Sequence, residues 1–204
     1  MNSTVGSKGR RGNYSPVETR KALLNAAIKL FDERGYHATP VEEIVVADGV
    51  TKGALYHHFS SKEDMLLGIQ DDYISDRLRN AKLILDTYPT ATERLRRLVH
   101  ESLSTVALYR GHVTIFMQEQ RFLRGERFAA IKTKRDEVDA VYQMVIQQGV
   151  ESGEFRPEIK TRIAGFAVLG TLAWAYYWYQ PGGQLTTDEV AEELTTYVLR
   201  GLQG

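Results

Sequence analysis

Apolar residues recur every three or four positions along most of the chain, which is the period of a helix with one buried face. The stripe from Leu23 to Phe31 is the clearest example, and Gly35 follows it where a helix commonly ends. No segment shows the sustained two-residue alternation of a half-buried strand. The pattern therefore predicts an all-α fold of about nine helices, at 16–34, 40–47, 52–58, 61–86, 91–109, 112–122, 125–151, 158–179 and 187–201.

Helix starts carry a second signal, a Ser or Thr followed three residues later by Glu. In such a capping box the hydroxyl accepts a hydrogen bond from a free backbone N–H, and the Glu reaches back to another. Pro16 and Pro40 stand at the expected first helical positions, where the missing N–H costs nothing. The predicted boxes are Ser15 with Glu18, Thr39 with Glu42, Ser60 with Glu63, Thr90 with Glu93 and Thr186 with Glu189.

Composition narrows the class of protein. The 204 residues are 43% hydrophobic and 25% charged, as in an ordinary folded domain, and they include no cysteine. Disulfides, thiolate nucleophiles and cysteine-bound metals are thereby excluded. No apolar run approaches the length of a membrane span, and the first residues are polar and basic, so we expect a cytoplasmic protein with no secretion signal.

Charge is balanced overall but not along the chain. The 26 basic residues equal the 26 acidic ones, yet residues 1–62 hold 9 Lys and Arg against 6 Asp and Glu. A polyanionic partner would therefore meet the N-terminal third, although uneven surface charge explains such a small excess equally well. Residues 1–15 are expected to form a mobile basic arm or a merely solvated tail.

Residues 39–59 have the layout of a helix-turn-helix, two short predicted helices separated by a turn at Gly49. In this motif the second helix enters the major groove of DNA. A helix turns about 100° per residue, so Leu55 and Phe59 share the buried side and Gly53 and His57 point away from it. The small and polar residues of that outward side suit close approach to a groove.

Groups that could hold phosphates surround this outward side. Hydroxyls at helix N-termini and basic side chains are typical phosphate contacts, although an ordinary helix cap is the alternative role for each hydroxyl. Neighbouring His57 and His58 point about 100° apart on a helix, so a metal site there is not expected. The expected DNA-binding residues are Arg20, Thr39, Thr51, Lys52, Gly53, Ala54, Tyr56, His57 and Lys62.

The stretch from Arg20 to Leu67 resembles the DNA-binding domain of the TetR family of bacterial transcriptional regulators. The resemblance rests on Gly35-Tyr36, on the run from Gly49 to Phe59, and on Lys62-Glu63. It implies a DNA-binding domain at 16–62, followed by a ligand-binding and dimerisation domain at 63–204. The segment from Trp178 to Gly183 is similar to a branch of the family that responds to acyl-coenzyme A thioesters of fatty-acid or sterol breakdown.

The C-terminal two thirds are rich in aromatic residues, which fill either a bundle core or a ligand cavity. Methionine beside rings and a few polar groups favours a cavity for an apolar guest. The expected ligand-binding residues are Tyr109, Phe116, Met117, Gln120, Arg121, Tyr142, Phe166 and Trp174. Small residues in helix 158–179 and an apolar stripe in helix 187–201 predict a four-helix interface with a second copy. Its expected members are Gly170, Trp178, Leu194, Tyr197 and Val198.

These features predict a repressor that binds a palindromic DNA operator as a homodimer and is released by a largely apolar small molecule, such as an acyl-coenzyme A. A regulator of drug-efflux or detoxification genes, induced by a lipophilic compound, is the alternative. An enzyme is disfavoured because the five histidines are scattered and no metal-ligand spacing occurs. No catalytic residue, cofactor or metal is therefore expected.

Overall fold

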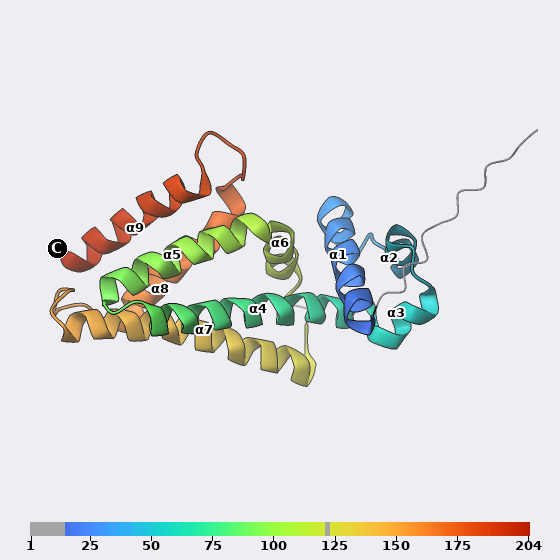
Figure 1. Ribbon diagram of the computed structural model, residues 1–204, viewed down its shortest axis with the longest axis horizontal. Helices are drawn as coiled ribbons and strands as arrows, with labels where there is room; N and C mark the ends of the chain where they lie inside the picture. The colour runs from blue at the N-terminus through green and yellow to red at the C-terminus, as the bar shows by residue number, and fades with distance from the viewer. Residues whose placement is uncertain (1–14, 121–122) are drawn as a thin grey trace, which may run out of the picture. The chain divides into compact units, whose positions relative to one another are not determined.

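Nine α-helices and no strand form the described part of the chain, residues 15–120 and 123–204 of a computed structural model (Figure 1). The all-α prediction is confirmed, and each predicted helix has a counterpart. The largest differences are at α6, which spans 110–119 rather than 112–122, and at α8, which begins at Thr161 rather than at 158. The helices are α1 (Pro16–Arg34), α2 (Val41–Asp48), α3 (Lys52–His58), α4 (Lys62–Thr87), α5 (Ala91–Leu108), α6 (Arg110–Glu119), α7 (Gly125–Glu151), α8 (Thr161–Trp178) and α9 (Thr187–Gln203).

Two of the predicted capping boxes are complete. Ser15 and Glu18 cap each other's backbone N–H at the start of α1, and Thr186 and Glu189 do so at the start of α9. At α5 the Thr90 hydroxyl accepts from the backbone N–H three residues later, at 3.2 Å. Side chains thus satisfy backbone donors that the helix itself leaves free.

The other two boxes were predicted wrongly. Helix α2 is preceded by Pro40 as its N-cap and has no side-chain cap, because the hydroxyl of Thr39 is used elsewhere. At α4 the capping pair lies one residue later than expected. There the hydroxyl of Ser61 accepts from the N–H of Asp64 at 3.0 Å, and the Asp64 carboxylate accepts from the N–H of Ser60 at 2.9 Å.

The chain divides into two compact units between Ile69 and Gln70, within α4. The N-terminal unit contains α1, α2, α3 and the first turns of α4. Its core consists of apolar residues that the helix periodicity places inward, and all of them are almost fully buried. They include Leu23, Phe31, Ile44, Leu55, Phe59 and Met65.

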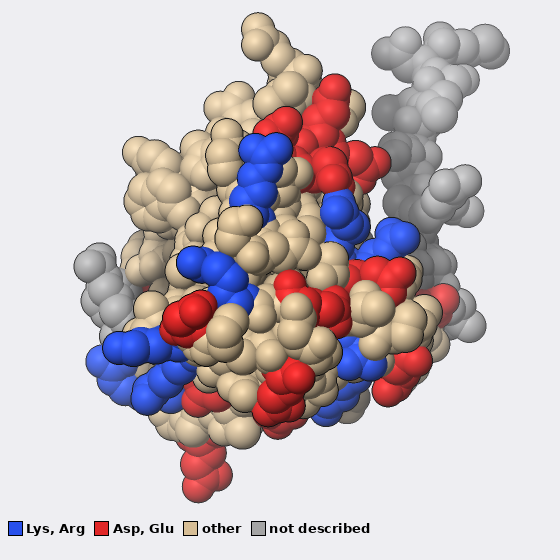
Figure 2. All heavy atoms as spheres, turned by 90° about the vertical axis from the view of Figure 1, so that its left-hand side faces the viewer, with Lys and Arg blue, Asp and Glu red and all other residues tan. Residues whose placement is uncertain are grey.

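The C-terminal unit is a bundle in which α5 packs against α7, α8 and α9, and α7 packs against α8 (Figure 1). Gly165 permits the close α7–α8 contact, since a Cβ at this position would lie 2.7 Å from the side chain of Gln143. No helix among the described residues is both long and apolar enough to cross a membrane. On the face shown in Figure 2, acidic and basic side chains are interspersed, in keeping with the zero net charge.

Candidate DNA-binding and ligand-binding sites

The turn between α2 and α3 has the geometry expected of a helix-turn-helix. Gly49 adopts a left-handed conformation with φ of 69°, which ends α2 and which a larger residue would adopt only with strain. Thr51 then caps α3, its hydroxyl accepting from the N–H of Ala54 at 3.1 Å. The local sequence therefore fixes both the end of the first helix and the start of the second.

Burial along α3 agrees with the expected orientation. Leu55 is fully buried, whereas Gly53 and His57 are exposed and Ala54 is half-buried. The ring of Tyr56 is 49% exposed. The outward side of α3 thus offers the hydroxyl of Tyr56, the imidazole of His57 and the exposed backbone of Gly53. These groups are suited to contact base edges and phosphates in a major groove.

Lys52 already has an anionic partner in the free protein. Its ammonium lies 2.6 Å from Oε1 of Glu42 on α2, and both side chains are exposed. The hydrogen bond from Lys52 lowers the pKa of Glu42, and Glu42 in turn raises the pKa of Lys52. A phosphate must therefore compete with Glu42 for this lysine.

Lys62 was expected to contact a DNA phosphate, but the structure does not leave its ammonium free for this role. Its Nζ donates to the carbonyl oxygens of Tyr36 at 2.8 Å, Thr39 at 3.0 Å and His37 at 3.4 Å. The ammonium also lies 4.6 Å from the centre of the Tyr36 ring. Lys62 thus ties the start of α4 to the segment between α1 and α2.

The expected phosphate contact of Thr39 is also wrong, because its hydroxyl is already used within the protein. Its side chain is fully buried, and its hydroxyl donates to the carbonyl oxygens of Gly35 at 2.9 Å and Leu30 at 3.2 Å. It therefore closes the C-terminal end of α1 and is not available to a phosphate. Arg20 is half-buried, with its guanidinium 5.7 Å from the centre of the Phe59 ring.

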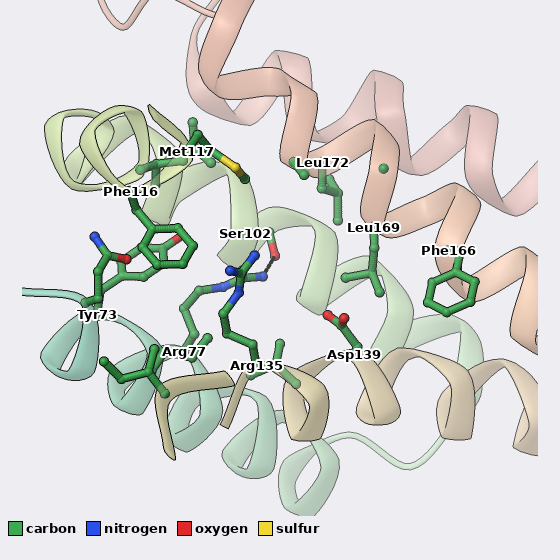
Figure 3. A pocket seen from close by; sticks show the side chains of 18 residues that line it. Tyr73, Arg77, Ser102, Phe116, Met117, Arg135, Asp139, Phe166, Leu169 and Leu172 are labelled. Atoms are coloured by element: carbon green, nitrogen blue, oxygen red, sulfur yellow. Dashed lines mark hydrogen bonds between the residues drawn. The ribbon is translucent and has the colours of Figure 1, made fainter. Parts of the chain in front are cut away.

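The C-terminal unit encloses a cavity of about 330 Å³ between helices α4 to α8 (Figure 3). Three of the expected ligand-binding residues line it, namely Phe116, Met117 and Phe166. Its volume lies at the lower end of the range of roughly 300–1,000 Å³ that is usual for small-molecule sites. The wall is mostly apolar, so the cavity suits an apolar guest.

Other expected ligand-binding residues lie away from this wall. Tyr142 is a core residue, because its hydroxyl is buried between Oγ of Ser102 at 2.6 Å and the carbonyl of Leu98 at 3.0 Å. Trp174 is 57% exposed and stacks on Tyr177, with ring centres 4.9 Å apart.

Tyr109 packs on His112, with ring centres 4.9 Å apart, instead of facing the cavity. Gln120 supports the wall from behind by accepting a hydrogen bond from Arg135 at 3.1 Å. Arg121 lies outside the described residues.

Three charged residues of the cavity wall were not among the expected ligand-binding residues, namely Arg77 on α4 and Arg135 and Asp139 on α7. Figure 3 shows both guanidinium groups in the middle of the pocket. Burial lowers the pKa of Arg135 and raises the pKa of Asp139. The signal was present, because each arginine interrupts an otherwise apolar helical stripe, as between Tyr73 and Ala81.

Helices α8 and α9 each expose large apolar side chains. Besides Trp174, they include Trp178 and Tyr197, the latter 69% exposed, with Leu194 and Val198 half-buried beside it. Gly170, expected at a dimer interface, also lines the cavity. Large exposed apolar side chains of this kind are typical of a surface that another protein covers.

Within residues 15–120 and 123–204, no three His, Asp or Glu side chains lie close enough together to bind a metal ion. An outward-facing helix-turn-helix in one unit and a ligand-sized cavity in the other are the parts of a ligand-responsive DNA-binding regulator.

The comparisons with known proteins agree. Residues 23–69 match the family model of bacterial regulatory proteins of the tetR family, and residues 88–202 match that of the tetracyclin repressor-like C-terminal domain. The chain therefore belongs to the TetR family of bacterial transcriptional regulators. Members of this family are DNA-binding regulators rather than enzymes.

Three similar proteins match most of the length of this chain. The transcriptional repressor KstR2 of Rhodococcus jostii is 35% identical over 98% of this chain and 94% of its own length. The structure of the ketosteroid transcriptional regulator KstR2 of Mycobacterium tuberculosis superimposes with a TM-score of 0.83, at 30% identity, over 95% of this chain and 97% of that one. The structure of AibR with isovaleryl coenzyme A and operator DNA gives 0.78, at 28% identity, over 88% and 97%.

Proposed function

We propose that this regulator is a repressor that binds a palindromic operator as a homodimer, in the cytoplasm where that DNA lies, and releases it when a small molecule enters the C-terminal cavity. The repressor role is supported by the similarity to KstR2. We assign DNA binding to residues 16–62 and ligand binding and dimerisation to residues 63–204. The observation that carries the proposal is that α4 supplies both the first turns beside the helix-turn-helix and part of the cavity wall.

DNA contact is assigned to the outward side of α3 and its N-terminus, that is to Thr51, Lys52, Gly53, Ala54, Tyr56 and His57. Arg20 adds positive charge beside Phe59. One such short helix buries little surface, so a single copy would bind weakly. Two copies whose reading helices lie about 34 Å apart would reach successive major grooves, which is the usual reason for a palindromic operator.

The second copy would cover the exposed face of α8 and α9, at Gly170, Trp178, Leu194, Tyr197 and Val198. Tyr197→Asp would bury a charge in this interface and leave the cavity wall unchanged. We expect the variant to sediment as a monomer and to lose cooperative operator binding. A variant that stays dimeric and binds DNA normally would refute this assignment.

The effector is a largely apolar molecule, and an acyl-coenzyme A thioester of lipid or sterol breakdown is the class that we favour. The structure of AibR with isovaleryl coenzyme A supports this class. A cavity of about 330 Å³ has room for an acyl group but not for the nucleotide part of coenzyme A, which would extend outside it.

Fluorescence anisotropy with labelled DNA from upstream of the protein's own gene and its neighbours tests the whole proposal. We expect saturable binding that unlabelled non-specific DNA does not displace. Acyl-coenzyme A compounds should then weaken this binding by roughly fivefold to a hundredfold, the usual strength of coupling between two sites. If specific binding is seen but no acyl thioester changes it, the effector class is wrong while the DNA-binding role stands.

A further inference from the structure

Within the described part of the chain, the two arginines of the cavity wall donate hydrogen bonds to uncharged side chains. Nη2 of Arg77 donates to Oγ of Ser102 at 2.9 Å, and its Nε is buried without a hydrogen-bond partner. Nη1 of Arg135 donates to Oε1 of Gln120 at 3.1 Å, and its guanidinium lies 4.5 Å from the centre of the Phe116 ring. Among the described residues, neither guanidinium forms an ion pair. Both acceptors are neutral, although arginine keeps its charge in proteins.

The opposite charge inside the cavity is insufficient. Asp139 is the one carboxylate among the described wall residues, so at most one negative charge faces the two guanidinium groups. Glu101 acts on Arg77 from outside the wall, but it already accepts hydrogen bonds from Asn80 at 3.1 Å and Thr105 at 2.9 Å. The cavity therefore holds an excess of positive charge, which is costly to bury unless an anion joins it.

Most of the remaining wall is apolar and does not favour a strongly polar guest. Ile74, Val113, Ile131, Val138 and Leu172 line the same cavity as the two arginines. Such a wall favours binding of an apolar ligand body. The paired arginines favour binding of an anionic group at one point of the wall. Planar guanidinium groups match the two oxygen atoms of a carboxylate particularly well.

We propose that the cavity binds a ligand with an apolar body and one carboxylate, and that Arg77 and Arg135 together bind this carboxylate. The inference rests on the proposed function only in taking this cavity as the effector site. The carboxylate has two possible sources. One is a free carboxylic acid of medium length, and the other is an acyl thioester whose acyl chain ends in a second carboxylate.

Isothermal titration calorimetry on the full-length protein tests the proposal with matched probes. Decanoic acid and methyl decanoate differ in the anionic group, and decanedioyl-coenzyme A and decanoyl-coenzyme A differ in the distal carboxylate. We expect one carboxylate-bearing member of these pairs to bind at least about tenfold more tightly than its partner, the usual effect of hydrogen bonds to a charged group. The pair that shows the difference identifies the source.

Three variants locate the effect. Arg135→Gln should remove the preference for the carboxylate. Arg79→Gln, an exposed arginine on α4 outside this wall, should leave it unchanged. Asp139→Asn removes a competing negative charge and should tighten binding of the carboxylate probe by about threefold to tenfold, without changing binding of the neutral probe. This gain cannot result from misfolding.

Several results would overturn the proposal: no binding of either carboxylate probe, equal binding within both pairs, or a preference that survives in Arg135→Gln. Operator release, measured separately, tests the proposed function instead. A carboxylate that binds through Arg135 but does not weaken operator binding leaves the site standing and removes its role as the effector site.

Discussion

Replacing Lys62 with Met distinguishes a structural role from a phosphate contact. Methionine keeps an apolar chain against Tyr36 but cannot donate to the carbonyls that Lys62 now holds at 2.8 and 3.0 Å. A hydrogen bond from a charged donor contributes about 1.5–3 kcal/mol. Lys62 is half-buried and its third bond is long, so solvent weakens these bonds, and we expect a combined loss of about 2 kcal/mol of unfolding free energy.

Urea unfolding followed by circular dichroism measures this loss. With an m-value of about 2 kcal/mol/M, the midpoint should fall by about 1 M. Operator affinity should be measured at several salt concentrations with the same variant. Because backbone carbonyl groups hold the ammonium of Lys62, we expect the slope of log K against log salt to match that of the wild type.

Lys52→Met is the matched contrast, and Lys132→Met on α7 is the neutral control. Lys52 is exposed at the start of α3, so its loss should reduce the salt slope with little effect on stability. A phosphate contact by Lys62 would instead reduce the slope by about 0.9 for each lysine lost, or about 1.8 for a dimer. That result, combined with an unchanged urea midpoint, would refute the structural role.

Three further changes test other contacts. Glu42→Gln should free Lys52, tightening operator binding and steepening its salt dependence; unchanged anisotropy titrations would show that the pair does not compete with DNA. Tyr142→Phe should cost about 1–3 kcal/mol by leaving buried partners unsatisfied, seen as a lower melting temperature with unchanged effector binding. Burial lowers the pKa of His112 from 6.5 to about 4, so the unfolded chain binds the proton more readily and stability falls as pH drops from 6.5 toward 4. This contribution, about 1–3 kcal/mol, should be absent from the urea midpoints of His112→Gln, and an identical pH dependence would contradict it.

The helices and the reading face could be predicted because they depend on local rules. Apolar spacing sets which side of each helix is buried, and rotation of about 100° per residue is enough to place Leu55 inward and His57 outward. Ser15 and Thr186 were also predicted correctly, since a capping box involves neighbours within one turn.

The cavity wall could not be predicted to the same extent because it depends on packing between distant helices. An aromatic residue in a helical stripe can be core, cavity or exposed surface, and Tyr142, Phe116 and Trp174 take these three roles in turn. Lys62 illustrates the same limit for polar groups. Its carbonyl partners lie 23–26 residues earlier in the chain, and no local pattern indicates that it reaches them.

Helix α4 gives the proposed sensing and reading functions a common element. Its residues include Lys62, which holds the segment between α1 and α2, and Arg77, which faces the cavity. A ligand that draws Arg77 toward its carboxylate would act on the same helix whose first turn holds the N-terminal unit together. The lysine expected to bind DNA directly would then influence DNA binding through the position of α4.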